Sequence, residues 1–491
     1  MIRRSIPVAV ALGVALLTLS CAEVTRRLPL LAPEHVGPGA SPAPEIPWTP
    51  PANASPPVRS SVAPAFPPGY KAGMALSLAQ AIDIALANNP STRTAWLQAR
   101  ATEEQLGSER SAFLPQVDLA VSAGRQAASV TNASTPTTYG ASLALTYLLF
   151  DFGGRAAVVE EARQTLIAAD FLHNATIQNV ILNLEDAYFQ LLAVKALIAS
   201  QEATLKELQT SLDAAEARHG AGVATIADVL QARTAYSQAR LTADTLSGSL
   251  QVGAGTLATL MGLPPQTDFS FGTLPADIPA TEMAEPIESL LARATAERPD
   301  LAASRAAGER ARARITEVRS SYLPSIGLSS SIGTTFVGSP GSGHSFNPVS
   351  AGVALRFPLF TGFRNSYDMR VAELDVQIAD EQTRGLAQQI GLDVWTGYFG
   401  VRTASLRVRT SRDLLTSAQQ SLDVATGRYK EGLGTILDVL TAESALANAR
   451  AQEVQARADW LLSLAQLAHG MGSLTPETAA AGTPATTGTL R

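Results

Sequence analysis

The chain is internally duplicated, and this feature limits its possible folds more than any other. Three pairs of segments match, each at a separation of 209 or 210 residues. They are Asn89-Pro90 with Arg298-Pro299, Phe113-Leu114-Pro115 with Tyr322-Leu323-Pro324, and Asp228-Val229-Leu230 with Asp438-Val439-Leu440. A separation this constant predicts two tandem copies of one structural unit, over residues 75–272 and 284–476.

The beginning of the chain has the pattern of an export signal. Arg3 and Arg4 precede an apolar stretch over residues 6–19, which is too short to span a bilayer. This pattern predicts a secretory signal peptide over residues 1–20. Cys21 follows directly as the only cysteine, and the run Leu17-Thr18-Leu19-Ser20-Cys21 resembles a bacterial lipobox. The resemblance implies a lipid anchor on Cys21; the alternative is an ordinary signal peptide that has a cysteine near its end.

Two further segments are predicted to lie outside the folded copies. Between Pro29 and Pro68 the chain is rich in proline, which fixes an extended backbone and removes hydrogen-bond donors. We therefore expect residues 21–74 to form a spacer that tethers the folded part to the lipid. Residues 477–491 are rich in Ala, Gly and Thr and are predicted to be a disordered tail.

Each copy contains a very long segment without proline, over 154–220 and 364–430. At a rise of about 1.5 Å per residue such a segment predicts a helix near 100 Å in length. Apolar residues at steps of three and four (Val180, Leu184, Tyr188 and Leu191 in the first copy) are typical of a coiled coil. A glycine-bearing tip turn and a return helix follow, with Gly220 and Gly222 in the first turn and Gly432 and Gly434 in the second.

Before each long helix the pattern changes to strict alternation. Leu143, Leu145 and Tyr147 alternate with small or polar residues, and Val349, Val353 and Leu355 do the same up to Phe360. The stretches 125–138 and 334–348 between strands are predicted to be surface loops. This alternation favours four outer-membrane strands per chain. The alternative is a soluble hairpin whose apolar face packs on the helices. Four strands cannot close a barrel, so membrane strands would require several chains.

Composition excludes several classes of function. Hydrophobic residues make up 46% of the chain and charged residues 16%. This charged fraction is too low for a disordered protein. A net charge of −6 gives no reason to expect nucleic acid as a partner. The five histidines are scattered, and no metal-ligand spacing, nucleophile motif or phosphate-binding loop is present. We therefore expect no enzyme activity, no cofactor and no metal.

The motifs together resemble the TolC-like outer-membrane efflux family. The resemblance covers almost the whole chain after residue 75 and rests on the matched segments given above, on Leu149-Phe150-Asp151-Phe152-Gly153-Gly154-Arg155, and on the two tip turns. It implies a mixed α and β membrane protein, a homotrimer whose 12-stranded outer-membrane β-barrel continues into a long α-helical coiled-coil barrel. It also implies a periplasmic adaptor protein and an inner-membrane pump as partners, contact with outer-membrane lipid, and a location in the outer membrane that extends into the periplasm.

The resemblance also places a periplasmic gate at the helical tips. It assigns an acidic pore ring to Asp438 and links between helices to Asp228 and Tyr429. The family's arginine partner falls on Gly434, and its second acidic ring position falls on Thr441. The alternative from the residues alone is that both aspartates cap helices, because Thr225 and Thr435 lie three residues before them.

Three functions are therefore compared. The favoured one is a passive channel of a tripartite efflux or type I secretion system, whose cargo the sequence leaves open. The second is a lipid-anchored structural coiled-coil protein of the cell envelope. The third is a cell-surface enzyme, for which the sequence offers no catalytic set.

Overall fold

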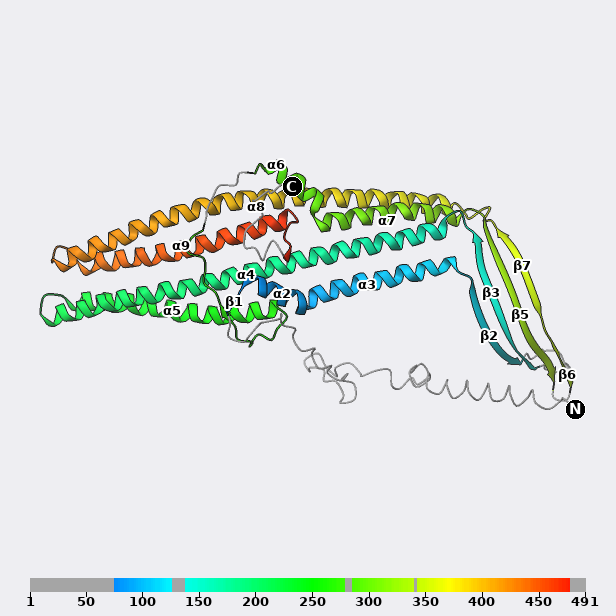
Figure 1. Ribbon diagram of the computed structural model, residues 1–491, viewed down its shortest axis with the longest axis horizontal. Helices are drawn as coiled ribbons and strands as arrows, with labels where there is room; N and C mark the ends of the chain where they lie inside the picture. The colour runs from blue at the N-terminus through cyan, green and yellow to red at the C-terminus, as the bar shows by residue number, and fades with distance from the viewer. Residues whose placement is uncertain (1–74, 126–136, 279–284, 340–341, 477–491) are drawn as a thin grey trace. The chain divides into compact units, whose positions relative to one another are not determined.

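A computed structural model describes residues 75–125, 137–278, 285–339 and 342–476. The predicted signal peptide, Cys21, the spacer over residues 21–74 and the tail over 477–491 lie outside the described residues. The described part is mostly helical and carries a small antiparallel sheet (Figure 1).

The helices form two series of nearly equal lengths. The first series is α2 (Leu78–Asn88), α3 (Pro90–Arg110), α4 (Gly154–Gly220) and α5 (Ile226–Leu260). The second is α6 (Ile287–Glu297), α7 (Pro299–Ser321), α8 (Arg364–Lys430) and α9 (Ile436–Gly470). Both α4 and α8 have 67 residues, and both α5 and α9 have 35. We call the α4–α5 pair hairpin 1 and the α8–α9 pair hairpin 2.

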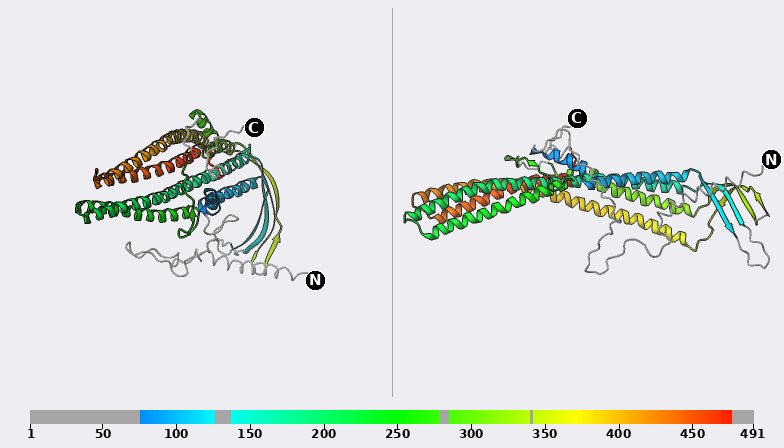
Figure 2. Two further views of the ribbon diagram at one scale, coloured as in Figure 1. Left: turned by 60° about the vertical axis from the view of Figure 1, so that its left-hand side comes forward. Right: turned by 90° about the horizontal axis from the view of Figure 1, so that it is seen from below.

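The long helices are held by packing along their apolar stripes. Val180, Leu184, Tyr188 and Leu191 of α4 are all buried, as the predicted coiled-coil spacing requires. Helix α4 packs against α3, α5, α7 and α9, whereas α8 packs against α6, α7 and α9 (Figure 2). Helix α4 therefore joins the two series, and α8 keeps one side without a neighbouring helix in the described part of the chain.

The sheet consists of β2 (Gln116–Arg125), β3 (Thr137–Phe150), β5 (Ser325–Ser339), β6 (Ser342–Phe346) and β7 (Val349–Arg356). The order is β2-β3-β5, and β6 and β7 pair with successive parts of the far side of β5. The sheet is therefore four strands wide. Its outer edges are β2 on one side and β6 with β7 on the other.

Two predictions about the strands were wrong. Most of the stretch 334–348 is not a loop, because β5 continues to Ser339 and β6 pairs back on β5. Pro348 has no N–H to donate, which explains why this edge is divided into two strands; its carbonyl accepts from Gly333 N–H at 3.0 Å. The last strand ends at Arg356 and not at Phe360.

The register brings the predicted apolar residues onto one face. Leu119 pairs with Leu143, Leu143 with Ile332, and Ile332 with Val349, so one apolar row crosses all four strand positions. Leu119 is 71% exposed and Val349 70%. The helices leave these side chains uncovered, which is contrary to the alternative in which this face packs on them.

A β-bulge lies where β3 meets the first long helix. The register shifts between Leu148 and Phe150, so that Phe150 pairs with Ile326. Paired residues lie on the same face of a sheet. The bulge therefore moves Phe150 onto the apolar face with Ile326, whereas the alternation predicted it on the opposite face.

A second, two-stranded parallel sheet was not predicted. It pairs β1 (Ala75–Leu76) with β4 (Ser270–Phe271). The Tyr188 hydroxyl donates to the Leu76 carbonyl at 2.9 Å and so attaches this sheet to α4. No helix within the described ranges is both long and apolar enough to cross a membrane.

Candidate functional site

The tips of the two hairpins have the same turn. Gly222 and Gly432 adopt left-handed backbone conformations, with φ of 78° and 73°. The N–H of the following residue then reaches back to the end of the helix, from Val223 to the Arg218 carbonyl at 3.0 Å and from Leu433 to the Arg428 carbonyl at 2.8 Å. This arrangement is a Schellman end, which favours glycine at the left-handed position.

The other two predicted turn glycines have a different status. Neither Gly220 nor Gly434 has a positive φ. A Cβ on Gly220 would meet nothing within 4 Å, and one on Gly434 would lie 3.3 Å from Arg428 Cβ. The backbone therefore requires glycine at two of the four predicted positions.

Both predicted gate aspartates form capping boxes. At the start of α5, the Thr225 N–H and hydroxyl donate to Asp228 Oδ2 at 2.8 and 2.9 Å. At the start of α9, the Thr435 N–H and hydroxyl donate to Asp438 Oδ2, both at 2.9 Å. These hydrogen bonds lower the pKa of the exposed Asp438 carboxyl, which is therefore charged at neutral pH. The capping geometry is thus present, and the gate role remains a prediction.

Tyr429 is not linked to Asp228 within the described residues of this chain; its contact is with Arg218. The Arg218 guanidinium lies over the Tyr429 ring, 4.2 Å from its centroid. The Nη2 atom of Arg218 also donates to the Tyr429 carbonyl at 2.9 Å and to the Lys430 carbonyl at 3.4 Å. Arg218 thus joins the end of α4 to the last carbonyls of α8, where a cation is favoured by the helix dipole.

Sequence reasoning missed Arg218. The available signal was that arginine occurs at the equivalent position of both tips, Arg218 and Arg428, at the separation of 210. The two side chains behave differently, because Arg428 Nη2 donates to the Leu433 carbonyl of its own turn at 3.3 Å. Arg218 crosses to the other hairpin, where it meets the Tyr429 ring, whereas the residue equivalent to Tyr429 in hairpin 1 is His219.

Polar contacts continue this connection along the seam between α4 and α9. The Ser211 hydroxyl donates to Glu443 Oε1 at 2.6 Å, and both residues are buried. Farther from the tip, Arg450 donates to both carboxylate oxygens of Glu207, each at 2.9 Å. Burial raises the pKa of Glu443, Ser211 partly offsets this effect, and the negative charge of Glu207 adds to it. Glu443 Oε2 is buried and has no hydrogen-bond partner among the described residues.

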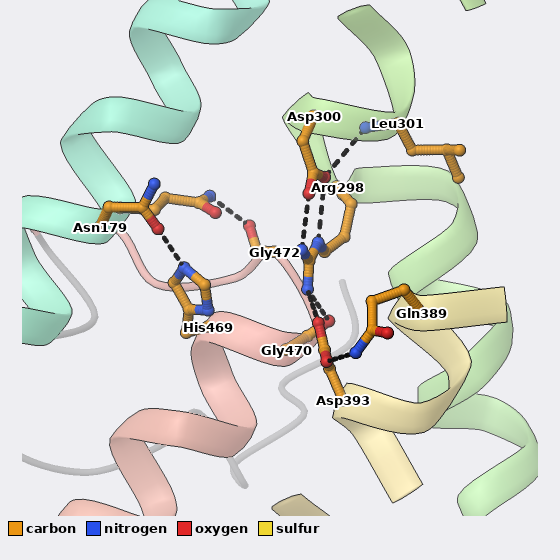
Figure 3. A network of polar contacts seen from close by, with 10 residues as sticks. Asn179, Arg298, Asp300, Leu301, Gln389, Asp393, His469, Gly470 and Gly472 are labelled. Carbon is orange, nitrogen blue, oxygen red and sulfur yellow. Dashed lines mark hydrogen bonds and ion pairs between the residues drawn. The ribbon is translucent and has the colours of Figure 1, made fainter. Parts of the chain in front are cut away.

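A second polar cluster lies where the return helix α9 ends (Figure 3). Arg298, which directly precedes α7, bonds both oxygens of Asp300, at 3.0 and 2.6 Å, and one oxygen of Asp393 at 3.1 Å. Its Nη1 atom also donates to the Gly470 carbonyl at 3.4 Å. The group thereby fastens α7, α8 and α9 together. Within the described residues, no group of three or more His, Cys, Asp or Glu side chains could hold a metal ion.

Three comparisons relate this geometry to known proteins. The model of the outer membrane efflux protein family matches the chain twice, over residues 81–263 and 290–473. The chain is 26% identical over 389 residues to Protein CyaE of Bordetella pertussis, which covers 77% of this chain and 80% of that protein. It is 25% identical over 415 residues to outer membrane protein TolC of Escherichia coli, covering 81% and 82% of the two chains.

The fold is also similar to that of solved structures. The outer membrane protein VceC of Vibrio cholerae superposes with a TM-score of 0.70 at 24% identity, covering 80% of this chain and 96% of that one. The open state of the outer membrane channel MtrE of Neisseria gonorrhoeae gives a TM-score of 0.68 at 23% identity, covering 85% and 98%.

Proposed function

The chain belongs to the outer membrane efflux protein family, and from this premise we propose that three copies assemble into one closed channel whose helical tips form its gate. The protein is an outer-membrane efflux channel, and the family consists of channels and not enzymes. The proposal concerns how this chain builds that channel: a barrel of 12 strands, four from each protomer, continued by a barrel of long helices.

The sheet carries this proposal. Its apolar residues lie in register on one exposed face, while the opposite face carries small or polar residues such as Asp118, Ser331 and Ser350. Both outer edges, β2 and β6 with β7, have no strand partner among the described residues. Open edges are not tolerated in lipid, because their N–H and C=O groups would remain unsatisfied. Pairing the two edges between protomers removes this cost.

The free side of α8 supports the same assembly. Tyr367, Val371, Leu374 and Ile378 follow one another at steps of four, three and four, and all four side chains are exposed. Trp395 and Phe399 extend the exposed apolar surface of this helix. Such spacing is typical of a coiled-coil seam. In a trimer, a helix of the next protomer would cover it.

The gate is proposed at the tips, with two groups in different roles. Three copies of Asp438 would place charged carboxylates around the axis, where they attract cations. Within each protomer, Arg218 would hold hairpin 1 against hairpin 2 through the carbonyl and ring of Tyr429. Asp228, whose carboxylate accepts from Thr225 and from no other described residue, would act as a link between protomers.

The proposed partners are a periplasmic adaptor protein and an inner-membrane pump. Val223 and Leu433 occupy the equivalent position in the two tip turns and are 73% and 72% exposed. They give the tips an apolar surface that an adaptor could cover. The predicted lipid on Cys21 would tether the chain to the outer membrane; equal palmitate labelling of wild type and Cys21→Ser would contradict this.

Assembly is tested by the mass of the purified protein in mild detergent, together with its migration on gels before and after heating. We expect a trimer that migrates faster before heating than after it, as a closed barrel does. A stable monomer that keeps its full strand content would overturn the shared barrel.

A further inference from the structure

The corners between the sheet and the long helices hold two phenylalanines in a strained backbone conformation. Phe152 and Phe363 are the only non-glycine residues with positive φ in the described ranges, at 51° and 65°. Phe152 lies two residues before the start of α4, and Phe363 lies directly before the start of α8. The adjacent Gly153 and Gly362 also have left-handed backbone conformations. Left-handed backbone disfavours a bulky side chain, so an observed outlier of this kind points to a function of the side chain.

Each strained phenylalanine belongs to an aromatic pair. Phe152 meets Phe150 edge-to-face at 4.7 Å between ring centroids, and Phe363 meets Phe360 in the same way at 5.7 Å. All four rings remain exposed. The bulge in β3 places Phe150 on the apolar face of the sheet, so the first pair lies at the border of that face. Outer-membrane barrels carry girdles of aromatic residues where the apolar face meets water.

Unpaired arginines lie at the same corners. Arg110 ends α3, Arg319 lies in the last turn of α7, and Arg364 begins α8. All three side chains are exposed, and none has an ion pair or hydrogen bond with another described residue. Arg110 and Arg319 are equivalent in the two halves, 209 residues apart.

Four carboxylates in the flanking turns accept hydrogen bonds from other side chains. Asp151 accepts from Arg155, Glu317 from Arg314, Asp368 from Tyr322 and Glu109 from Gln105. None of these four carboxylates accepts a hydrogen bond from Arg110, Arg319 or Arg364. Favourable interaction with a helix dipole accounts for an arginine at a carboxyl-terminal end, as at Arg110 and Arg319, but it opposes Arg364 at the amino-terminal end of α8.

We propose that these corners bind the phosphate groups of anionic phospholipids in the periplasmic leaflet of the outer membrane. Guanidinium groups bind phosphate oxygens through paired hydrogen bonds, which suits Arg110, Arg319 and Arg364. The aromatic pairs would lie beside them at the level of the glycerol backbone, with the apolar sheet face continuing into the acyl chains. The inference rests on the proposed barrel, because only a sheet in the membrane brings the corners to the headgroups.

The test measures lipid retained by the trimer. Trimers are equilibrated with phosphatidylglycerol and phosphatidylcholine in detergent, and native mass spectrometry gives the ratio of the two lipids bound. The triple variant carries Arg110→Gln, Arg319→Gln and Arg364→Gln. In it we expect the preference for phosphatidylglycerol to fall by about fivefold for each arginine removed. Arg409→Gln is the matched control and should leave the ratio unchanged, because Arg409 lies within α8, is exposed and has no side-chain partner among the described residues. An unchanged ratio in the triple variant would overturn the proposal.

A second variant separates lipid binding from packing. Glycine adopts the left-handed conformation of Phe363 without strain but loses the ring contact with Phe360, so Phe363→Gly should leave the temperature at which the lipid-free trimer dissociates nearly unchanged. The same variant should retain less phosphatidylglycerol. A lower dissociation temperature without lipid would show that Phe363 serves packing and would overturn its role here. Trimers that form and conduct but show no lipid preference would refute this inference alone, whereas failure to form trimers would refute the proposed channel.

Discussion

The two hairpin tips have the same local structure but different contacts. Both have a left-handed glycine, a Schellman end and a Thr–Asp capping box. Yet Arg218 of hairpin 1 reaches across to hairpin 2, while Arg428 bonds its own turn. Ile226 is 56% exposed, whereas its equivalent Ile436 is 3% exposed. Local sequence therefore sets the turn, and packing between the hairpins decides which tip carries the connection.

The opposite ends of the return helices differ in the same manner. Asn89 and Arg298 are equivalent residues that directly precede a proline. Asn89 donates to the Leu260 carbonyl at 2.8 Å, and Arg298 donates to the equivalent Gly470 carbonyl at 3.4 Å. Only Arg298 also binds carboxylates, Asp300 and Asp393. A neutral contact in one half is thus an ionic cluster in the other.

The largest effect should come from removing this ionic cluster's centre. Arg298 is buried, so Arg298→Met leaves two carboxylates without their cation and should destabilise the protein by about 3–5 kcal/mol. Asn89→Ala removes one neutral contact and a cap and should cost about 1–2 kcal/mol. The measurement is the shift in thermal unfolding of the detergent-solubilised protein. Equal shifts would show that the ionic cluster adds nothing to the shared contact.

The same cluster has a defined pH dependence. Burial alone would raise the pKa of Asp300, but the hydrogen bonds and charge of Arg298 outweigh burial and leave that pKa below its ordinary value of 3.8. Because the pKa of Asp300 is lower in the folded state, its ionised carboxylate stabilises the fold at pH values above the unfolded-state pKa. This contribution is lost as the pH falls through the folded-state pKa. The stability gap between wild type and Arg298→Met should therefore narrow below about pH 4.

The second prediction compares two glycines with the same backbone conformation. Gly262 and Gly432 both have φ of 73°, but a Cβ on Gly262 would lie 2.5 Å from the Asn88 carbonyl oxygen and one on Gly432 would meet nothing within 4 Å. Gly432→Ala should cost about 1–2 kcal/mol from backbone strain alone. Gly262→Ala should cost about 1–3 kcal/mol more, because the backbone must move. Thermal unfolding measures both losses of stability. Equal losses would show that the backbone around Gly262 and Asn88 moves apart at no cost.

The third prediction concerns the two arginines at the tips. Arg218→Gln removes charged hydrogen bonds and a ring contact worth about 1–3 kcal/mol together, part of which glutamine can replace. If these contacts hold the closed tip, the open fraction should rise by about tenfold. Arg428→Gln should change the open fraction less than twofold, because it removes one exposed contact. Planar-bilayer conductance is the measurement; a larger effect at Arg428 would reverse the assignment.

The sequence allowed the helices to be predicted well and the contacts between them poorly. The absence of proline and the heptad-like steps located α4 and α8, and the Thr–Asp spacing indicated the caps, because all of these depend on neighbouring residues. The partner of Arg218 depends on how two hairpins more than 200 residues apart pack, which no local pattern records. The continuation of β5 through 334–339 was missed because its Ser, Thr and Gly residues are also typical of loops. The bulge at Phe150 interrupts the alternation that was used to assign faces.

The fourth prediction contrasts Glu443 with its equivalent in hairpin 1, Arg233. Arg233 forms an exposed ion pair with Glu216 at 2.7 Å, whereas Glu443 is buried against Ser211. Because burial raises the folded-state pKa of Glu443, its cost to stability begins above the unfolded-state value of 4.5 and grows as pH rises. The free energy of unfolding of Glu443→Gln should equal that of wild type near pH 4 and exceed it by about 1 kcal/mol at pH 8. Arg233→Gln should shift stability by about 0.5 kcal/mol or less at either pH. Thermal unfolding at the two pH values decides; a constant difference for Glu443→Gln would contradict the titration.

The last prediction separates charge from capping at the two tip aspartates. Asparagine keeps a side-chain oxygen for the Thr435 N–H, so Asp438→Asn should cost only about 0.3–1 kcal/mol, mainly by losing a charge near a helix amino terminus. Asp228→Asn should cost the same, because the two boxes have nearly identical geometry. The variants should differ in ion selectivity, since three Asp438 carboxylates would face the axis of the closed tip while Asp228 would face a neighbouring protomer. Reversal potentials across a planar bilayer with a salt gradient measure this difference. We expect cation preference to fall in Asp438→Asn and to change little in Asp228→Asn. If both variants keep the wild-type reversal potential, Asp438 is a helix cap alone and the constriction of this channel lies elsewhere.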